Sequence, residues 1–249
     1  MKISIHEDQI LENEKHWEEK PLLREIYREF HLLIAANLSR NPGGIIVELG
    51  SGIGNIKEVI PDCVRTDLFP NPWIDQVENA YALSFEDESV SDLILFDVFH
   101  HLRYPGAALQ EFRRVLKEGG HVIIFDPCIS LLGWLIYGVF HQEPIGYFQP
   151  IEWFPPAGWF PAEMTYYAAQ GNATRIFVGN GFKRSLHGWK QKTLVRSAAI
   201  SYVASGGYSH KQLYPRSALP LMKALDALCD TIPFLFATRM LVVLEKSSD

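Results

Sequence analysis

The chain has 249 residues, of which 47% are hydrophobic and 21% are charged. This ordinary globular balance provides enough apolar material for a core, so a disordered chain is excluded. The net charge of −6 argues against a general nucleic-acid binder, and we expect no nucleic-acid partner. Three cysteines, Cys63, Cys128 and Cys229, are far apart and odd in number, which favours a reducing, cytoplasmic setting over a disulfide framework.

Residues 1–41 are expected to form an N-terminal helical cap. The opening MKISIHEDQILENEKHW is charged and lacks the apolar core of a signal peptide. In LLREIYREFHLLIAANL, the spacing of Leu22, Ile26, Phe30 and Leu33 places them near one helix face. The Asn-Pro-Gly-Gly sequence that follows ends the helix.

Residues 42–127 alternate apolar strand patterns with short helices. We expect strands at 44–50, 63–68, 74–78, 91–98 and 121–127, and helices at 55–60 and 107–116. Gly119 and Gly120 are expected to stop the second helix. The alternation predicts a doubly wound α/β sheet.

The rest of the chain divides into an insertion and a return to the core. Residues 128–190 are rich in aromatic residues, proline and glycine, and are predicted to form an insertion that acts as a lid. A strand at 193–203, a helix at 217–229 and a final strand at 238–246 follow. The prediction is a Rossmann-like sheet of seven mostly parallel strands, with an antiparallel C-terminal strand and helices on both faces. Residues 42–127 and 191–249 are expected to form its core.

Two features leave the partners open. The apolar stretch 129–140 is shorter than the ~18–20 residues that a spanning helix needs. It could be a buried lid helix, a peripheral membrane contact or part of a homodimer interface. Residues 1–170 have a net charge of −13, whereas residues 171–249 have +7. The basic part could attract an anionic ligand or surface, or the two parts could pair with each other.

The main chemical motif is ELGSGIGN, residues 48–55, which follows a strand and opens a helix. Gly50, Gly52 and Gly54 let the backbone turn sharply and approach a ligand, with Ser51 between them. The spacing is G-x-G-x-G, not the G-x-G-x-x-G of dinucleotide binders. Glu48 would repel a pyrophosphate but suits a cationic ligand, such as the amino and sulfonium groups of S-adenosylmethionine.

Asp67 stands at the end of the second predicted strand, before Leu68. A carboxylate at this place can accept hydrogen bonds from both hydroxyls of a ribose. Its alternative role is to cap a turn or a helix.

Three further segments carry a family resemblance: NAYALSF (79–85), DVFHHL (97–102) and RVLKEGG (114–120). Together with the glycine loop, they resemble class I S-adenosylmethionine-dependent methyltransferases, in particular the type 11-like small-molecule and glycan subgroup. The resemblance implies that the glycine loop holds the methionine part of the cofactor and that Glu48 orients its amino group. It implies that Asp67 and Leu68 bind the ribose, Asn79 and Ala80 the adenine, and that Asp97 and Val98 line the floor below the sulfonium. Asn79 stands where the family usually has aspartate, and its amide carbonyl can still accept a hydrogen bond.

Four residues are candidates for acceptor chemistry. His100 and His101 follow the fourth predicted strand, at the sheet edge where ligands bind in such folds. His141 and Glu143 follow the apolar stretch and could act as base and orienting group. Each could instead be a structural or solvated residue. Scattered histidines and carboxylates give no metal-ligand spacing, so no metal is expected.

These features predict an S-adenosylmethionine-dependent methyltransferase that methylates oxygen or nitrogen of a small molecule or a lipid- or phosphate-linked glycan. The segment 205–228 also resembles methyltransferases of bacterial sugar-polymer assembly. One alternative is a non-catalytic protein that binds S-adenosylmethionine. Another is an NAD-dependent oxidoreductase, against which the glycine spacing and the lack of a Tyr-x-x-x-Lys pair argue.

Overall fold

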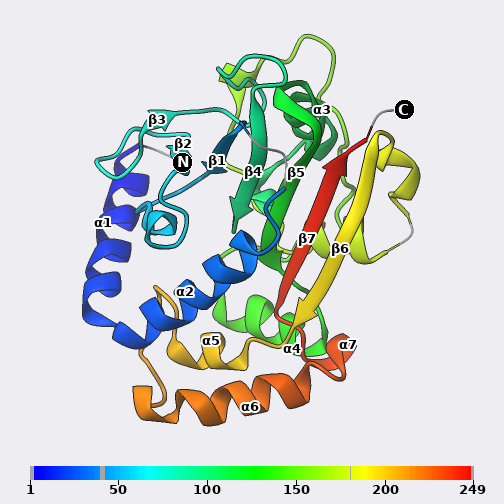
Figure 1. Ribbon diagram of the computed structural model, residues 1–249. Coiled ribbons are helices and arrows are strands. Elements are labelled where there is room, and N and C mark those ends of the chain that lie inside the picture. The colour runs from blue at the N-terminus through cyan, green and yellow to red at the C-terminus, as the bar shows by residue number, and fades with distance from the viewer. Residues whose placement is uncertain (1–2, 40–42, 180, 248–249) are drawn as a thin grey trace.

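The computed structural model describes residues 3–39, 43–179 and 181–247, and its centre is one seven-stranded sheet (Figure 1). The strands are β1 Ile45–Leu49, β2 Val64–Asp67, β3 Gln76–Val77, β4 Val90–Phe96, β5 Leu116–Pro127, β6 Trp189–Ser197 and β7 Arg239–Lys246. The helices are α1 Ile3–Glu19, α2 Pro21–Ala35, α3 Pro105–Val115, α4 Leu131–Leu135, α5 Ile200–Ser205, α6 Leu219–Cys229 and α7 Pro233–Phe236.

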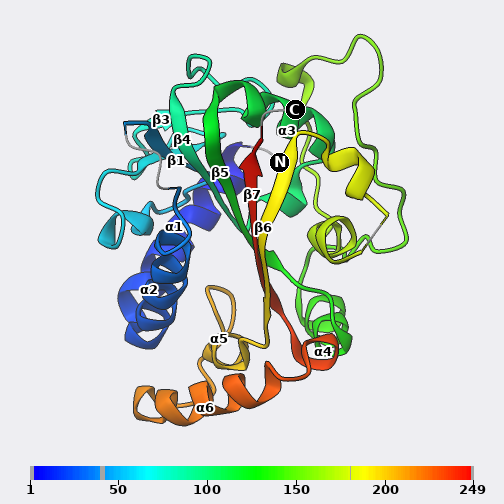
Figure 2. The same ribbon diagram turned by 45° about the vertical axis from the view of Figure 1, so that its right-hand side comes forward.

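The strand order is β3-β2-β1-β4-β5-β7-β6. The first five strands pair in parallel, whereas β7 runs antiparallel to both β5 and β6. Figure 2 shows α1 and α2 on one face of the sheet and α3 with most of the insertion on the other. The predicted Rossmann-like sheet with an antiparallel C-terminal strand is therefore confirmed.

Alternate residues of each central strand point to opposite faces and build two cores. Leu93 and Leu95 of β4 pack with Phe112 of α3 and with Phe177 of the insertion. On the other face, Ile94 packs with residues of α2 and β5 that include Leu22, Ile26, Phe30, Ile123 and Phe125. Because β4 is buried on both faces, its sequence is an almost continuous apolar run.

The expected strand at 193–203 is wrong in its second half. β6 begins earlier, at Trp189, and ends at Ser197, after which the chain forms α5. Ala199 adopts a left-handed backbone with φ +46°, and the Asp226 carboxylate of α6 accepts a hydrogen bond from the Ser201 N–H at 3.0 Å. This long-range bond stabilises the start of α5, so the segment forms a helix although its β-branched residues favour a strand.

The expected stop at Gly119 and Gly120 is also wrong. α3 ends at Val115 and the chain enters β5 at Leu116, so both glycines lie within the strand. Gly119 has φ +72°, which glycine adopts without the strain that a side chain would impose. The short strand predicted near residues 74–78 is present as β3, reached from β2 through a loop.

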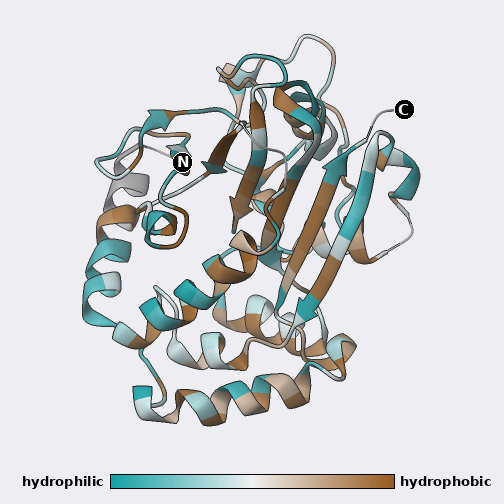
Figure 3. Ribbon diagram, viewed as in Figure 1, coloured by the Kyte–Doolittle hydropathy of each residue, from teal (hydrophilic) through white to brown (hydrophobic). Residues whose placement is uncertain are grey.

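The stretch 129–140 forms α4, which lies against α7, and a π-helical turn, Ile136–Phe140, which packs on α4. Leu131, Leu135 and Val139 are more than half exposed, so this is not a fully buried lid helix. Leu228 of α6 and Phe234 of α7 are more than half exposed as well. Figure 3 shows hydrophobic residues, coloured brown, along both helices. Within the described ranges, no helix combines the length and the apolar character needed to cross a bilayer.

Candidate active site

Acidic side chains mark the carboxyl ends of four neighbouring parallel strands. Glu48 belongs to β1, Asp67 ends β2, Asp97 follows β4 and Asp126 lies near the end of β5. In Figure 1, α2, α5 and α4 lie beside this edge of the sheet. Open α/β sheets bind ligands in the crevice outside the carboxyl ends of their strands, so this edge is the candidate active site.

The glycine loop folds tightly between β1 and the sheet edge. Gly50, Gly52 and Gly54 all have left-handed φ values, between +52° and +71°. A Cβ at Gly50 would lie 2.5 Å from Cγ2 of Val98, whereas a Cβ at Gly52 would have no described atom within 4 Å. The Gly52 N–H donates to Oδ2 of Asp67 at 3.1 Å. The loop therefore packs closely on Val98 at one side and faces open space at Gly52.

Glu48 is buried beside this loop. Its Oε2 atom has no hydrogen-bond partner among the described residues. Burial raises the pKa of Glu48 to about 7, and the nearby Asp67 adds to the rise. A buried carboxylate oxygen without a partner is costly, and a cationic group placed against it would remove that cost. This feature fits the amino group of S-adenosylmethionine.

The residues predicted for ribose and adenine lie at the same edge. Asp67 is buried, and its Oδ1 accepts from the Leu68 N–H at 2.7 Å. Asn79 is already engaged by its neighbours: Oδ1 accepts from the Tyr81 N–H at 3.0 Å and Nδ2 donates to the Pro161 carbonyl at 3.1 Å. Ala80, which follows it, is half-buried. The adenine role of Asn79 and Ala80 stays a prediction.

Asp97 joins the site to the start of β7. It has φ +57°, a left-handed backbone that is uncommon outside glycine and marks functional sites when the surroundings enforce it. Its carboxylate forms an ion pair with the buried Arg239, whose guanidinium carbon lies 4.5 Å from the centre of the Tyr202 ring. The sequence did not identify Arg239 or Tyr202 as site residues. Arg239 is a single charged residue at the start of an apolar strand, and Tyr202 lies in the segment predicted as a strand that forms α5, so neither belongs to a motif.

The four candidates for acceptor chemistry come together. Nε2 of His100 lies 3.5 Å from Oε2 of Glu143, and Nε2 of His101 lies 3.7 Å from Oε1. Nδ1 of His141 lies 3.9 Å from Oε2 of the same carboxylate. The 3-10 turn Phe99–His101 presents the two histidines, and the insertion brings Glu143 from 42 residues beyond His101.

Several partners orient this cluster. Nδ1 of His100 lies 3.1 Å from Oδ1 of Asp126, and Nδ1 of His101 lies 2.9 Å from the Tyr167 carbonyl. The Tyr166 hydroxyl and the Gln170 side-chain amide both donate to Glu143. The sequence did not identify these partners, although the acid at the end of the fifth strand continues the pattern of Glu48, Asp67 and Asp97.

Charge within the cluster is unevenly shared. Burial would lower the pKa of His100, but the carboxylates of Asp126 and Glu143 outweigh burial and raise it to about 10. Burial and the neighbouring His100 charge lower the pKa of His101 to about 4. Although burial favours the neutral carboxyl, the two histidines hold the pKa of Glu143 well below its usual range. Neighbouring groups with pKa values pushed in opposite directions are typical of functional sites.

Some aromatic residues of the insertion pack on the protein, whereas others, such as Phe148 and Phe160, are more than half exposed. The Trp159 ring contacts the rings of Tyr81 and Tyr104, and Trp153 stacks on Phe182 with ring centroids 5.5 Å apart.

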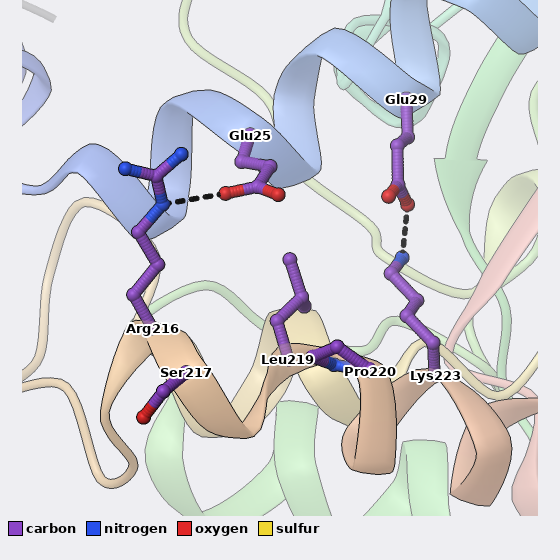
Figure 4. Close-up of a pocket in the computed structure, with 7 residues that line it drawn as sticks. All are labelled: Glu25, Glu29, Arg216, Ser217, Leu219, Pro220 and Lys223. Carbon is purple, nitrogen blue, oxygen red and sulfur yellow. Dashed lines mark hydrogen bonds and ion pairs between the residues drawn. The ribbon is translucent and has the colours of Figure 1, made fainter.

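A groove of about 520 Å³ lies away from this site, between α2 and α6 (Figure 4). Ion pairs of Glu25 with Arg216 and of Glu29 with Lys223 bridge it, so its charges are already paired.

Comparisons with known proteins agree with this geometry. Residues 47–124 match the family model of a methyltransferase domain. Among curated proteins, no sequence matches the chain significantly. One similar solved structure is an S-adenosylmethionine-dependent methyltransferase from Thermotoga maritima, described as a possible histamine N-methyltransferase. It is 16% identical with a TM-score of 0.53, and the match covers 96% of this chain and 99% of that one.

A second similar structure is geranyl diphosphate C-methyltransferase from Streptomyces coelicolor, in complex with Mg²⁺, geranyl diphosphate and S-adenosylhomocysteine. It is 11% identical with a TM-score of 0.54, and the match covers 89% of this chain and 80% of that one. Such similarity shows a shared fold. The family model identifies residues 47–124 as a methyltransferase domain, and the fold is one that S-adenosylmethionine-dependent methyltransferases share.

Proposed function

We propose that this chain transfers a methyl group from S-adenosylmethionine to an oxygen or nitrogen of a small molecule or a lipid- or phosphate-linked glycan. The observation that carries the proposal is a pair of sites on one sheet edge. The glycine loop, Glu48 and Asp67 form one, and the cluster around Glu143 forms the other. The two adjoin, because His100 follows Asp97 by three residues.

The first site is proposed to hold the cofactor. The unpartnered Oε2 of Glu48 supports its role toward the amino group, and the buried Asp67 supports ribose binding. Leu68, Asn79 and Ala80 complete the ribose and adenine side, and Asp97 with Val98 forms the floor. When bound, S-adenosylmethionine supplies the methyl group from its sulfonium in an in-line displacement.

The second site is proposed to receive the acceptor, with residues 128–190 as its lid. A hydroxyl acceptor must lose a proton as it attacks the methyl carbon. His100, His101, His141 and Glu143 are titratable groups that meet here, and we assign them to holding the acceptor and accepting its proton. Positioning the acceptor atom in line with the sulfonium is the other contribution of this site.

An acceptor screen tests the proposal through S-adenosylhomocysteine formation with matched phosphorylated and dephosphorylated sugars and lipid-linked sugars. We expect turnover with a phosphate-bearing acceptor. Glu143→Gln should lower kcat by roughly 100-fold or more, without weakening cofactor binding. Turnover with uncharged acceptors only would exclude the phosphate-linked class. Cofactor binding without turnover on any acceptor would favour a non-catalytic binding protein.

The exposed apolar residues of α4, α6 and α7 are proposed to rest on a lipid surface. They include Leu131 and Leu135 of α4 and Leu228 of α6, and α4 lies beside α7. The geranyl diphosphate enzyme is an example of this fold acting on an acceptor that joins an apolar chain to phosphates. Free thiols at the buried cysteines Cys63, Cys128 and Cys229 fit a cytoplasmic setting for this contact.

Vesicle binding tests this contact. The chain should sediment with vesicles of phosphatidylcholine and phosphatidylglycerol, and replacing both Leu131 and Leu135 by serine should release it. Leu11→Ser on α1, which removes another exposed leucine, should leave sedimentation unchanged. A stable homodimer that buries the α4 residues, without vesicle binding, would contradict the lipid contact.

A further inference from the structure

Hydrogen bonds fix which nitrogen of each active-site histidine carries a proton. Nδ1 of His101 lies 2.9 Å from the carbonyl oxygen of Tyr167, which can only accept. The proton must therefore be on Nδ1, and the neutral ring carries its lone pair on Nε2. Nδ1 of His100 donates in the same way to the Asp126 carboxylate, at 3.1 Å.

Both Nε2 atoms then face the same carboxylate. They lie 3.5 Å and 3.7 Å from the two oxygens of Glu143. In the metal-free protein, the raised pKa of His100 places a second proton on its Nε2, which a divalent cation would displace. The neutral His101 ring, with its proton on Nδ1, presents only a lone pair there, and so does each carboxylate oxygen. Lone pairs that face each other at this distance attract only through a proton or a cation between them.

We propose that Nε2 of His100, Nε2 of His101 and the carboxylate of Glu143 bind one divalent metal ion. One ligand atom from each residue lies within 4.8 Å of the other two. Protein nitrogen and oxygen ligands stand about 2.0–2.2 Å from such an ion, so two ligands of one ion are at most ~4.4 Å apart. The two measured nitrogen–oxygen separations fall inside this limit.

The surroundings have the form of an outer coordination shell. Metal-binding histidines commonly donate their other ring N–H to a carboxylate or a backbone carbonyl, as His100 and His101 do here. Ligating carboxylates are in turn hydrogen-bonded, as Glu143 is by Tyr166 and Gln170. The sequence could not show this set, because the insertion brings Glu143 to the histidines only on folding.

His141 is outside the ligand set. Its Nδ1 already accepts a hydrogen bond from the Glu143 N–H at 3.2 Å, so that lone pair is used. Two imidazoles and one carboxylate suit Zn²⁺, Mn²⁺ or Fe²⁺ better than Mg²⁺ or Ca²⁺, which prefer oxygen ligands. Three protein ligands leave coordination positions open. On the proposed function, the ion would hold an acceptor oxygen there and lower its pKa, so His100, His101 and Glu143 would promote loss of the acceptor proton through the ion and not as direct bases.

Metal titration of the intact chain, without an added histidine tag and after EDTA treatment, tests this site. Zn²⁺ or Mn²⁺ alone, followed by calorimetry, should bind at one equivalent. His101→Ala and Glu143→Gln should each weaken that binding at least tenfold, and His141→Ala should not. Asp126→Asn, which alters a positioning residue, should weaken it by roughly 10- to 100-fold.

The absence of saturable binding, or binding that His101→Ala and Glu143→Gln leave unchanged, would overturn the proposal. Equal affinity for Mg²⁺ and Zn²⁺ would contradict the assigned ligand set. Stabilisation by S-adenosylhomocysteine, measured on the same samples, reports folding and the cofactor site independently of metal. Normal stabilisation by S-adenosylhomocysteine without metal binding rejects the metal site alone. Metal binding without that stabilisation rejects the cofactor site alone.

Discussion

Glu48 predicts that cofactor affinity depends on pH. Burial raises its pKa to about 7, so the carboxyl of the free protein is mostly protonated at pH 6 and mostly ionised at pH 8. The cofactor amino group is a cation and favours the ionised form, so binding at low pH must first release a proton. We therefore expect calorimetry to show S-adenosylhomocysteine binding about tenfold more tightly at pH 8 than at pH 6.

Glu48→Gln separates this effect from other titrating groups. The amide cannot ionise, so binding should be weaker than in the wild type and nearly independent of pH over the same range. A wild-type affinity that is the same at both pH values would show that Glu48 does not face the cofactor cation.

The ion pair between Asp97 and Arg239 predicts a large effect on stability. Arg239 is buried, and loss of its partner charge leaves the guanidinium uncompensated. Asp97→Asn should therefore lower the free energy of unfolding by about 3 kcal/mol in urea. Asparagine tolerates the left-handed backbone as aspartate does, so the loss would report charge rather than strain.

Asp87→Asn is the control for that measurement. Asp87 also pairs with an arginine, Arg114, at 2.7 Å, but its side chain is largely exposed. Exposed pairs are worth at most about 1 kcal/mol. Equal losses of stability in the two variants would contradict the assigned importance of the buried pair.

At the scale of the elements, the glycine loop gives a matched comparison. Gly52 and Gly119 both have left-handed φ values, +52° and +72°, and a Cβ at either position would meet no described atom within 4 Å. Alanine at each should cost about 1–2 kcal/mol of stability through backbone strain. Only Gly52→Ala should also weaken S-adenosylhomocysteine binding, because its methyl group would enter the proposed cofactor space. Equal affinity of the two variants for S-adenosylhomocysteine would show that the cofactor does not lie beside Gly52.

The elements that the sequence predicted best are those with strong local signals. The buried apolar runs of β1, β4 and β5 and the glycines after β1 follow from local steric and solvation effects, and the structure contains them. The junction of β6 and α5 could not be predicted this way. It depends on Asp226 and Asp230, whose carboxylates accept N–H bonds from Ser201 and Ala198, at least 25 residues earlier.

In the candidate site, too, local signals predicted the residues but not the contacts between distant segments. Residue type and position after a strand singled out His100 and His101, and a polar pair after an apolar run singled out His141 and Glu143. Their meeting depends on how the insertion folds back, where the Ala169 N–H bonds the His100 carbonyl at 3.0 Å. No local pattern encodes such a contact between distant segments.

At the scale of the whole molecule, the uneven charge is partly explained by internal pairing. Arg216, Lys223, Arg239 and Lys246 of the basic part form ion pairs with Glu25, Glu29, Asp97 and Glu88 of the acidic part. These contacts support the interpretation that the two parts pair with each other. The pairs of Arg216 and Lys223 join the C-terminal segments to α2, and the pair of Lys246 with Glu88 lies at the opposite, amino-terminal edge of β4. The pair of Arg239 with Asp97 lies at the carboxyl edge, so it helps to position the candidate active site.

Thermal unfolding with and without S-adenosylhomocysteine tests the central claim most directly. At ligand ~100-fold above its dissociation constant, binding should stabilise the chain by about 2.7 kcal/mol, a rise in Tm of roughly 5–10 °C. Asp67→Ala should fold and lose most of this rise. A folded wild-type chain that shows no rise at millimolar ligand, or an undiminished rise in Asp67→Ala, would contradict the proposed cofactor site.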